Sequence, residues 1–247
     1  MEYQNHPERS TPEHLFANQT VTATKSRSFI ANVFAYMFLA LGISAVVAYL
    51  FANNPEWLYP IVSNKLLVYV VMFAPLAFVL IMSFGFQKLS APVLIGLFIV
   101  YSAVTGLSLS FILLVYTANS VYACFASAAV MFGIMAFMGY TTKQDLTSFG
   151  RIMFMGLIGI IIASLINFFL QNDTMDYIIS FVGVMVFTGL TAYDVQKLKN
   201  IGAGIDADGN VLEADAKKLA IMGGLTLYLD FINLFLMLLR LFGGRRD

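Results

Sequence analysis

The longest uncharged stretch of the chain sets the strongest limit on its fold. The 54 residues from Leu89 to Thr142 contain no Asp, Glu, Lys or Arg. A single helix of that length would extend about 80 Å, whereas the hydrocarbon core of a bilayer is about 30 Å thick. The stretch therefore predicts two membrane-crossing helices, separated at the polar segment 117–120.

Composition and charge spacing extend this prediction to the whole chain. Only 11% of the 247 residues are charged, whereas a soluble domain carries roughly a quarter. Pro75 lies inside one apolar run and predicts a kink there. We expect an all-α membrane protein with seven transmembrane helices, at about 29–52, 65–84, 92–116, 121–141, 152–170, 176–199 and 217–242.

The polar N-terminal segment predicts a separate tail. Residues 1–28 are rich in charged and polar groups and lack the short apolar core of a secretory signal peptide. We expect a solvated, partly disordered cytoplasmic tail. Residues 29–243 should form one seven-helix domain, because no internal repeat divides them.

Basic residues predict the orientation, because Lys and Arg are enriched in cytoplasmic connections. With a cytoplasmic N-terminus, ten of the 14 basic residues lie inside. The four outside are Lys65, Arg240, Arg245 and Arg246. Because Arg245 and Arg246 would favour the cytoplasm, a last segment that re-enters instead of crossing is an alternative. We expect an integral protein of a bacterial inner membrane.

The same sequence argues against several function classes. Its formal net charge is zero and it has no basic cluster, so we expect no nucleic-acid binding. His6 and His14 lie in the tail, and Cys124 is the one cysteine. These residues form neither a zinc set nor a catalytic couple within the membrane. We therefore expect no cofactor and no enzymatic activity.

Three charged residues remain inside the predicted spans: Asp194, Asp230 and Arg240. The long side chain of Arg240 can extend to the membrane interface. The aspartates cannot, and buried acids usually face one another or a water-filled path. Because they lie on consecutive spans, we expect Asp194 and Asp230 to share one site and one proton.

Other polar residues in the spans are candidates for supporting roles. Tyr193 and Tyr228 are each close in sequence to an aspartate and could donate a hydroxyl proton, while Asn233 lies one turn from Asp230. Asn167 needs a hydrogen-bond partner in hydrocarbon. We expect an inter-helix bond there, with a substrate contact as the alternative.

Small residues at four-residue spacing predict a tight helix contact. Ser102, Gly106 and Ser110 share one face of the third span. Such a face lets two helix backbones approach closely. We interpret it as a packing surface and not as a binding site.

Two acidic residues without a histidine are also compatible with two other roles. One is an intramembrane aspartyl protease, but its second motif is Gly-x-Gly-Asp, and this chain has Leu227 and Leu229 in place of the glycines. The other is a purely structural proton-sharing pair that joins the sixth and seventh spans.

Two sequence segments carry a family resemblance. FTGLTAYDVQKLK (187–199) and LYLDFINLFLMLLRLFG (227–243) resemble the signature of the Bax inhibitor-1, or transmembrane Bax inhibitor motif, family. The resemblance implies two layers of three helices around a central C-terminal helix. It also implies that Asp194 and Asp230 form a pH-sensing dyad near the cytoplasmic mouth of a calcium leak.

One departure from the family pattern affects the gate. Some members carry an acidic residue and a basic latch on the second span, whereas this chain has no ionisable group between Lys65 and Lys88. The acidic connection 200–216 also fails the calcium-loop pattern, with Val211 and Lys217 where Gly and Glu belong. We expect a solvated loop there.

Two functional hypotheses follow. In the first, the chain is a pH-sensitive cation leak in which Ca²⁺ is the permeant ion and contacts Asp194 and Asp230 transiently. In the second, it is a non-conducting regulator that binds membrane protein partners. Membrane lipids surround the chain in both hypotheses.

Overall fold

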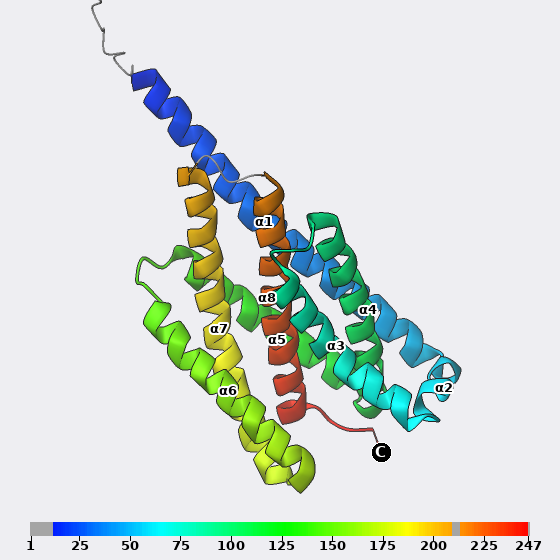
Figure 1. Ribbon diagram of the computed structural model, residues 1–247. Coiled ribbons are helices and arrows are strands. Elements are labelled where there is room, and N and C mark those ends of the chain that lie inside the picture. Colours follow the sequence, from blue (N-terminus) through cyan, green and yellow to red (C-terminus); the bar gives the residue numbers. More distant parts are fainter. Residues whose placement is uncertain (1–11, 209–212, 247) are drawn as a thin grey trace, which may run out of the picture.

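The computed structural model describes residues 12–208 and 213–246, without the side chains of 12–25 and 206–208. Across these residues the chain is helical and has no named strand. The elements are α1 (Pro12–Asn53), η1 (Pro55–Trp57), α2 (Tyr59–Val62), α3 (Lys65–Gly85), α4 (Ala91–Val115), α5 (Ala118–Thr141), α6 (Thr147–Leu170), α7 (Asp173–Asp208) and α8 (Glu213–Phe242) (Figure 1).

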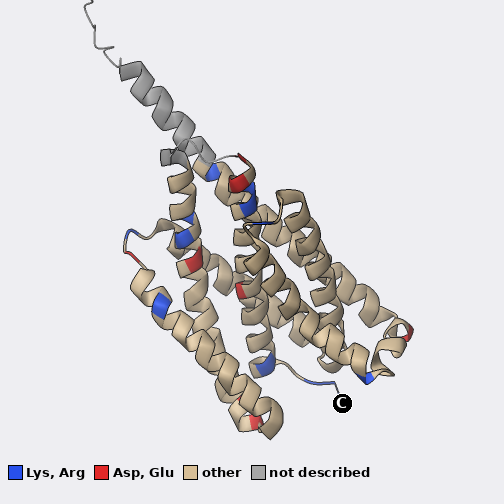
Figure 2. Ribbon diagram, in the orientation of Figure 1, with Lys and Arg blue, Asp and Glu red and all other residues tan. Residues whose placement is uncertain are grey.

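The all-α class and the count of seven long helices are confirmed. Within the described ranges, seven helices are long and apolar enough to cross a membrane. The uncharged stretch forms α4 and α5, and the chain turns at Tyr116 and Thr117 between them. Most charged residues lie near the helix ends, as Figure 2 shows, whereas one acidic residue lies well inside α7 (Asp194) and one well inside α8 (Asp230).

Three boundaries differ from the sequence prediction. α1 begins at Pro12, so residues 12–28 continue the first helix, and residues 1–11 lie outside the described chain. α7 continues to Asp208, which shortens the expected loop 200–216. α8 is one unbroken helix of 30 residues, about 45 Å long. That length favours a crossing over re-entry.

α8 occupies the centre of the bundle. It packs against α1, α4, α5 and α7, and half of its 30 residues are buried. α3 packs mainly on α4, and α6 mainly on α7, so these two helices lie at the outside. The arrangement of the other helices in two layers of three stays a prediction.

The small-residue face of α4 makes the close contact that the sequence indicates. A Cβ atom added at Gly106 would lie 2.6 Å from the carbonyl oxygen of Ser44 on α1. Ser102 and Ser110 are fully buried beside it. Because only glycine leaves room for the α1 backbone, Gly106 sets the separation of α1 and α4.

The proline inside α3 is compensated by a neighbouring helix. Pro75 has no N–H to donate to the carbonyl oxygen of Val71 one turn earlier. The Ser108 hydroxyl of α4 shares its proton between that oxygen at 3.1 Å and the Val104 carbonyl oxygen of its own helix at 3.2 Å. The hydrogen bond therefore satisfies the group that the proline leaves free, and it also fixes α3 against α4.

Candidate functional site

A large cavity lies between the two outer helices and the central one. Its volume is about 1490 Å³, and side chains of α3, α6, α7 and α8 supply most of its wall. In the view of Figure 1, α8 lies between α6 on the left and α3 on the right. α3 and α6 do not pack along each other within the described chain, which leaves the space between them open.

One face of α8 forms the polar wall of this cavity. Its members recur every three or four residues, which is the spacing of a single helix face. They are Thr226, Leu229, Asp230, Asn233, Met237 and Arg240. Helix periodicity therefore aligns one acid, one amide and one guanidinium along the cavity.

Asp194 of α7 and Asp230 of α8 meet in this cavity. Both line it, and their carboxyl groups lie within hydrogen-bonding range of each other. Asp230 is only 5% exposed. Its Oδ2 atom has no hydrogen-bond donor among the described residues.

A proton can supply the missing donor. Two adjacent carboxylates in a water-poor site cannot both carry a charge at low cost. If one carboxyl group is protonated, its O–H can donate to the other, and the pair holds a single negative charge. The geometry thus suits a shared proton.

The neighbouring polar residues only partly match the expected supporting set. Tyr193 and Asn233 line the cavity, although the Asn233 amide donates to the Leu229 carbonyl oxygen of its own helix at 2.8 Å. Tyr228 does not line it. The Tyr228 hydroxyl lies 2.7 Å from Ser44 Oγ on α1, so the prediction that Tyr228 donates to an aspartate is wrong.

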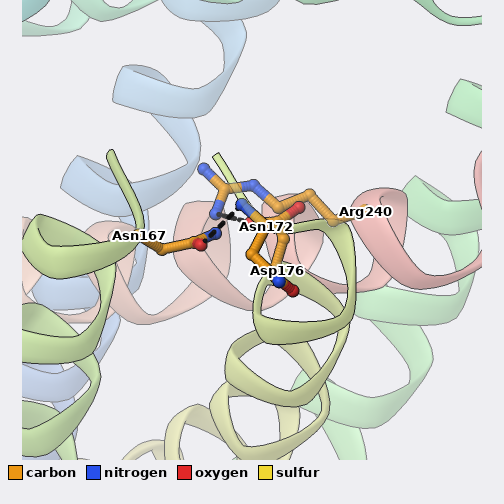
Figure 3. Close-up of polar contacts among 4 residues, drawn as sticks. All are labelled: Asn167, Asn172, Asp176 and Arg240. Atoms are coloured by element: carbon orange, nitrogen blue, oxygen red, sulfur yellow. Dashed lines mark hydrogen bonds and ion pairs between the residues drawn. The ribbon is translucent and has the colours of Figure 1, made fainter. Parts of the chain in front are cut away.

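Asn167 and Arg240 lie at the α6–α7 end of the bundle (Figure 3). Asn167 Oδ1 accepts from the backbone N–H of Asn172 at 3.0 Å. This bond joins the last turn of α6 to the residue that precedes α7, and the expected bond to a facing helix is absent among the described contacts. Arg240 lies in the last turn of α8, where its Nη1 atom lies 3.5 Å from Asp176 Oδ1; its extension to the membrane interface stays a prediction.

Several residues of the site were missed by sequence reasoning. Arg151 and Lys197 line the cavity near the α5–α6 connection, and Asp176 and Arg245 line it at the α6–α7 end. All four lie near predicted span ends, where charged residues are common, so no pattern in the sequence indicates that they face one cavity.

Gln196 joins α7 to the α5–α6 connection. Its Oε1 atom accepts from the Leu146 N–H at 2.8 Å, and its Nε2 atom donates to the Gln144 carbonyl oxygen at 2.7 Å. Gln196 lies two residues from Asp194, so these bonds fix the part of α7 that carries the carboxyl group.

The site does not resemble a resident metal centre. Among the described residues, no three His, Cys, Asp or Glu side chains gather in a group that could hold a metal ion. Two carboxyl groups offer fewer ligands than the six to eight oxygens that calcium prefers. A cation here would keep part of its hydration shell.

Comparison with known proteins identifies relatives across nearly the full length. A family model described as "Inhibitor of apoptosis-promoting Bax1" matches residues 26–247. The chain is 48% identical over 220 residues to the inner membrane protein YbhL of Escherichia coli K12, which covers 89% of this chain and 93% of that protein. It is 42% identical over 223 residues to the uncharacterized protein RP147 of Rickettsia prowazekii, covering 90% and 91%. An uncharacterized protein of Deinococcus radiodurans is 38% identical over 236 residues, covering 95% and 98%.

Proposed function

The chain belongs to the Bax inhibitor-1 family of integral membrane proteins, and from that premise we propose that it is a pH-sensitive calcium leak. In this proposal, Ca²⁺ passes through the cavity beside α8, and the protonation of Asp194 and Asp230 controls its passage. The observation that carries the proposal is that the buried carboxyl group of Asp230 and the half-buried one of Asp194 line a single cavity that extends towards both ends of the bundle.

The length of the cavity supports a path across the membrane. Along α7, its lining extends from Asp176 to Lys197. At about 1.5 Å per residue, that interval is about 32 Å, close to the hydrocarbon thickness of about 30 Å. The cavity lining therefore extends over about the thickness of the hydrocarbon core.

Protonation supplies the proposed control. With one shared proton, the hydrogen bond between Asp194 and Asp230 joins α7 to α8 across the cavity wall. Loss of that proton replaces the bond by repulsion between two carboxylates, which are also the oxygen ligands that calcium prefers. A small free-energy change at this contact biases a two-state gate, so the calcium flux depends on pH.

The proposed role is non-enzymatic and needs no cofactor. Leu227 is fully buried, at a position where the aspartyl protease motif has a glycine. The other glycine position of that motif is Leu229, whose side chain lines the cavity next to Asp230, so the open backbone that a peptide substrate would approach is absent there. We accordingly expect no cleavage of transmembrane peptides by the purified protein.

Calcium flux into liposomes tests the proposal. The purified full-length chain is reconstituted into vesicles that contain a calcium-sensitive dye, and the influx is measured as a function of pH against empty vesicles. We expect influx above the empty-vesicle rate, with a sigmoidal pH dependence. Influx no faster than in empty vesicles at every pH would refute the leak and favour a non-conducting regulator that binds membrane protein partners.

A further inference from the structure

The cavity lacks a protein wall on one side. α3 and α6 border it without packing along each other in the described chain. Side chains at its edge are also exposed at the surface of the bundle, including Phe73 of α3 at 53% and Met155 of α6 at 71%. In a bilayer this opening faces lipid, so acyl chains can enter from the side.

The two outer helices give this opening an apolar lining. Pro75, Leu76 and Val79 contribute from α3, while Phe154 and Leu157 contribute from α6. These side chains offer no hydrogen bonds to an ion or a polar solute. They do match the chemistry of a hydrocarbon chain.

Two arginines mark the α6–α7 end of the same cavity. Arg240 and Arg245 both line it. The distance of 3.5 Å between Arg240 and Asp176 exceeds the 2.7–2.9 Å typical of a charge-assisted hydrogen bond. No carboxylate of the described chain pairs with Arg245. This end therefore carries positive charge that Asp176 does not neutralise.

The backbone holds Arg245 in place. The Arg246 N–H donates to the Val115 carbonyl oxygen at 2.8 Å, and the Thr117 N–H donates to the Gly244 carbonyl oxygen at 2.9 Å. These bonds fix the C-terminal segment against the α4–α5 connection. Arg245 is therefore presented at the cavity by a fixed backbone.

We propose that this cavity binds an acidic phospholipid, with its acyl chain between α3 and α6 and its phosphate at Arg240 and Arg245. Guanidinium groups bind phosphate with two parallel hydrogen bonds, and the hydrocarbon chain completes the wall that the protein leaves open. The site does not depend on the calcium leak, because it rests on the lateral opening and the two arginines alone.

A protein helix fits this space less well. An apolar membrane-spanning helix would cover the apolar lining but would offer no phosphate to Arg240 and Arg245. An inorganic anion would meet the arginines but leave the apolar lining uncovered. The lipid satisfies both parts of the cavity.

Native mass spectrometry of the purified full-length protein tests the site. The protein in detergent is mixed with equal amounts of phosphatidylglycerol and phosphatidylcholine of the same chain length. The bound lipid is identified from the mass of each complex, and the intensities of the two complexes are compared. We expect about tenfold more complex with phosphatidylglycerol, since each arginine near a lipid phosphate strengthens binding several-fold. Millimolar inorganic phosphate should not displace the lipid.

Three variants make the test specific. Arg240→Gln with Arg245→Gln should abolish the preference, whereas Arg240→Lys with Arg245→Lys should keep most of it by retaining the charge. Arg246→Gln is the matched control, because Arg246 adjoins Arg245 but does not line the cavity. Equal binding of both lipids by the wild type, displacement by phosphate, or an unchanged preference in the double glutamine variant would each overturn the proposal.

Discussion

The Tyr228 hydroxyl is held inside the bundle by hydrogen bonds that join three helices. Ser44 of α1 donates its one proton to the Ser102 carbonyl oxygen of α4 at 2.7 Å. Tyr228 of α8 must therefore be the donor in its 2.7 Å contact with Ser44 Oγ. This chain of bonds fixes the central helix against α1 and α4.

Removal of either hydroxyl group should lower the stability of the protein through loss of the same hydrogen bond. Tyr228→Phe and Ser44→Ala should each lower the free energy of unfolding by about 1–2 kcal/mol, because each breaks the same buried bond. The double variant should then cost less than the sum of the two. Equilibrium unfolding in detergent measures this, with the exposed Tyr59→Phe as control. Strict additivity would show that the bond does not contribute.

The residues of the site could be predicted from sequence to different extents. Asp194 and Asp230 could be paired because intramembrane acids are rare and need a partner. Tyr228 and Asp230 are two residues apart, which places them about 200° apart around the helix axis. Tyr228 therefore could not donate a hydrogen bond to Asp230. The partner of Asn167 depends on where α6 ends, which a hydropathy pattern fixes only to within a few residues.

The packing of α3 around Pro75 depends on one serine of its neighbour α4. Ser108→Ala removes the donor to the Val71 carbonyl oxygen, which Pro75 already deprives of its helical partner. We expect a loss of about 1 kcal/mol in the free energy of unfolding, the typical contribution of a hydrogen bond, because the Val71 carbonyl is only half-buried. Unfolding in detergent checks this. Ser127→Ala is the control, since that exposed hydroxyl bonds only within α5, and an equal loss in both variants would contradict the account.

The contact of α1 with α4 should tolerate no side chain at Gly106. Gly106→Ala places a methyl group 2.6 Å from the Ser44 carbonyl oxygen, so α1 and α4 must separate and thermal stability should fall. Gly96→Ala on the same helix meets no atom within 4 Å and should leave stability unchanged or slightly higher, because alanine favours helix. A comparison of melting temperatures measures the pair. Equal melting temperatures would contradict the proposed close approach.

Helix number and approximate span positions follow from sequence because length, charge and hydropathy act locally. The opening between α3 and α6 could not be predicted from the sequence. Both helices are apolar on all sides, so the pattern does not indicate which neighbour each one packs against. The position of Arg245 could not be predicted from the sequence either. It depends on backbone hydrogen bonds that its neighbours Gly244 and Arg246 make with Thr117 and Val115, which are distant in the sequence.

The orientation of the whole bundle is a further prediction. With the N-terminus in the cytoplasm, the α6–α7 end faces outward, and so do Arg240 and Arg245. A reporter fused after Leu170 should read external, one after Asp208 internal, and one after Asp247 external. The opposite result for the first two fusions would show that the N-terminus is outside. An internal third fusion would favour a last segment that re-enters the membrane instead of crossing it.

The most direct test of the central claim is the pH dependence of calcium flux in the aspartate variants. Asp194→Asn and Asp230→Asn each remove one member of the proton-sharing pair, so each should flatten the flux-versus-pH curve, and the double variant should add little. Asp215→Asn is the matched control on α8, because Asp215 is exposed and outside the cavity, and it should keep the wild-type midpoint. If both single variants retain the wild-type curve, the shared proton does not control the flux, and Asp194 and Asp230 serve only to join α7 to α8.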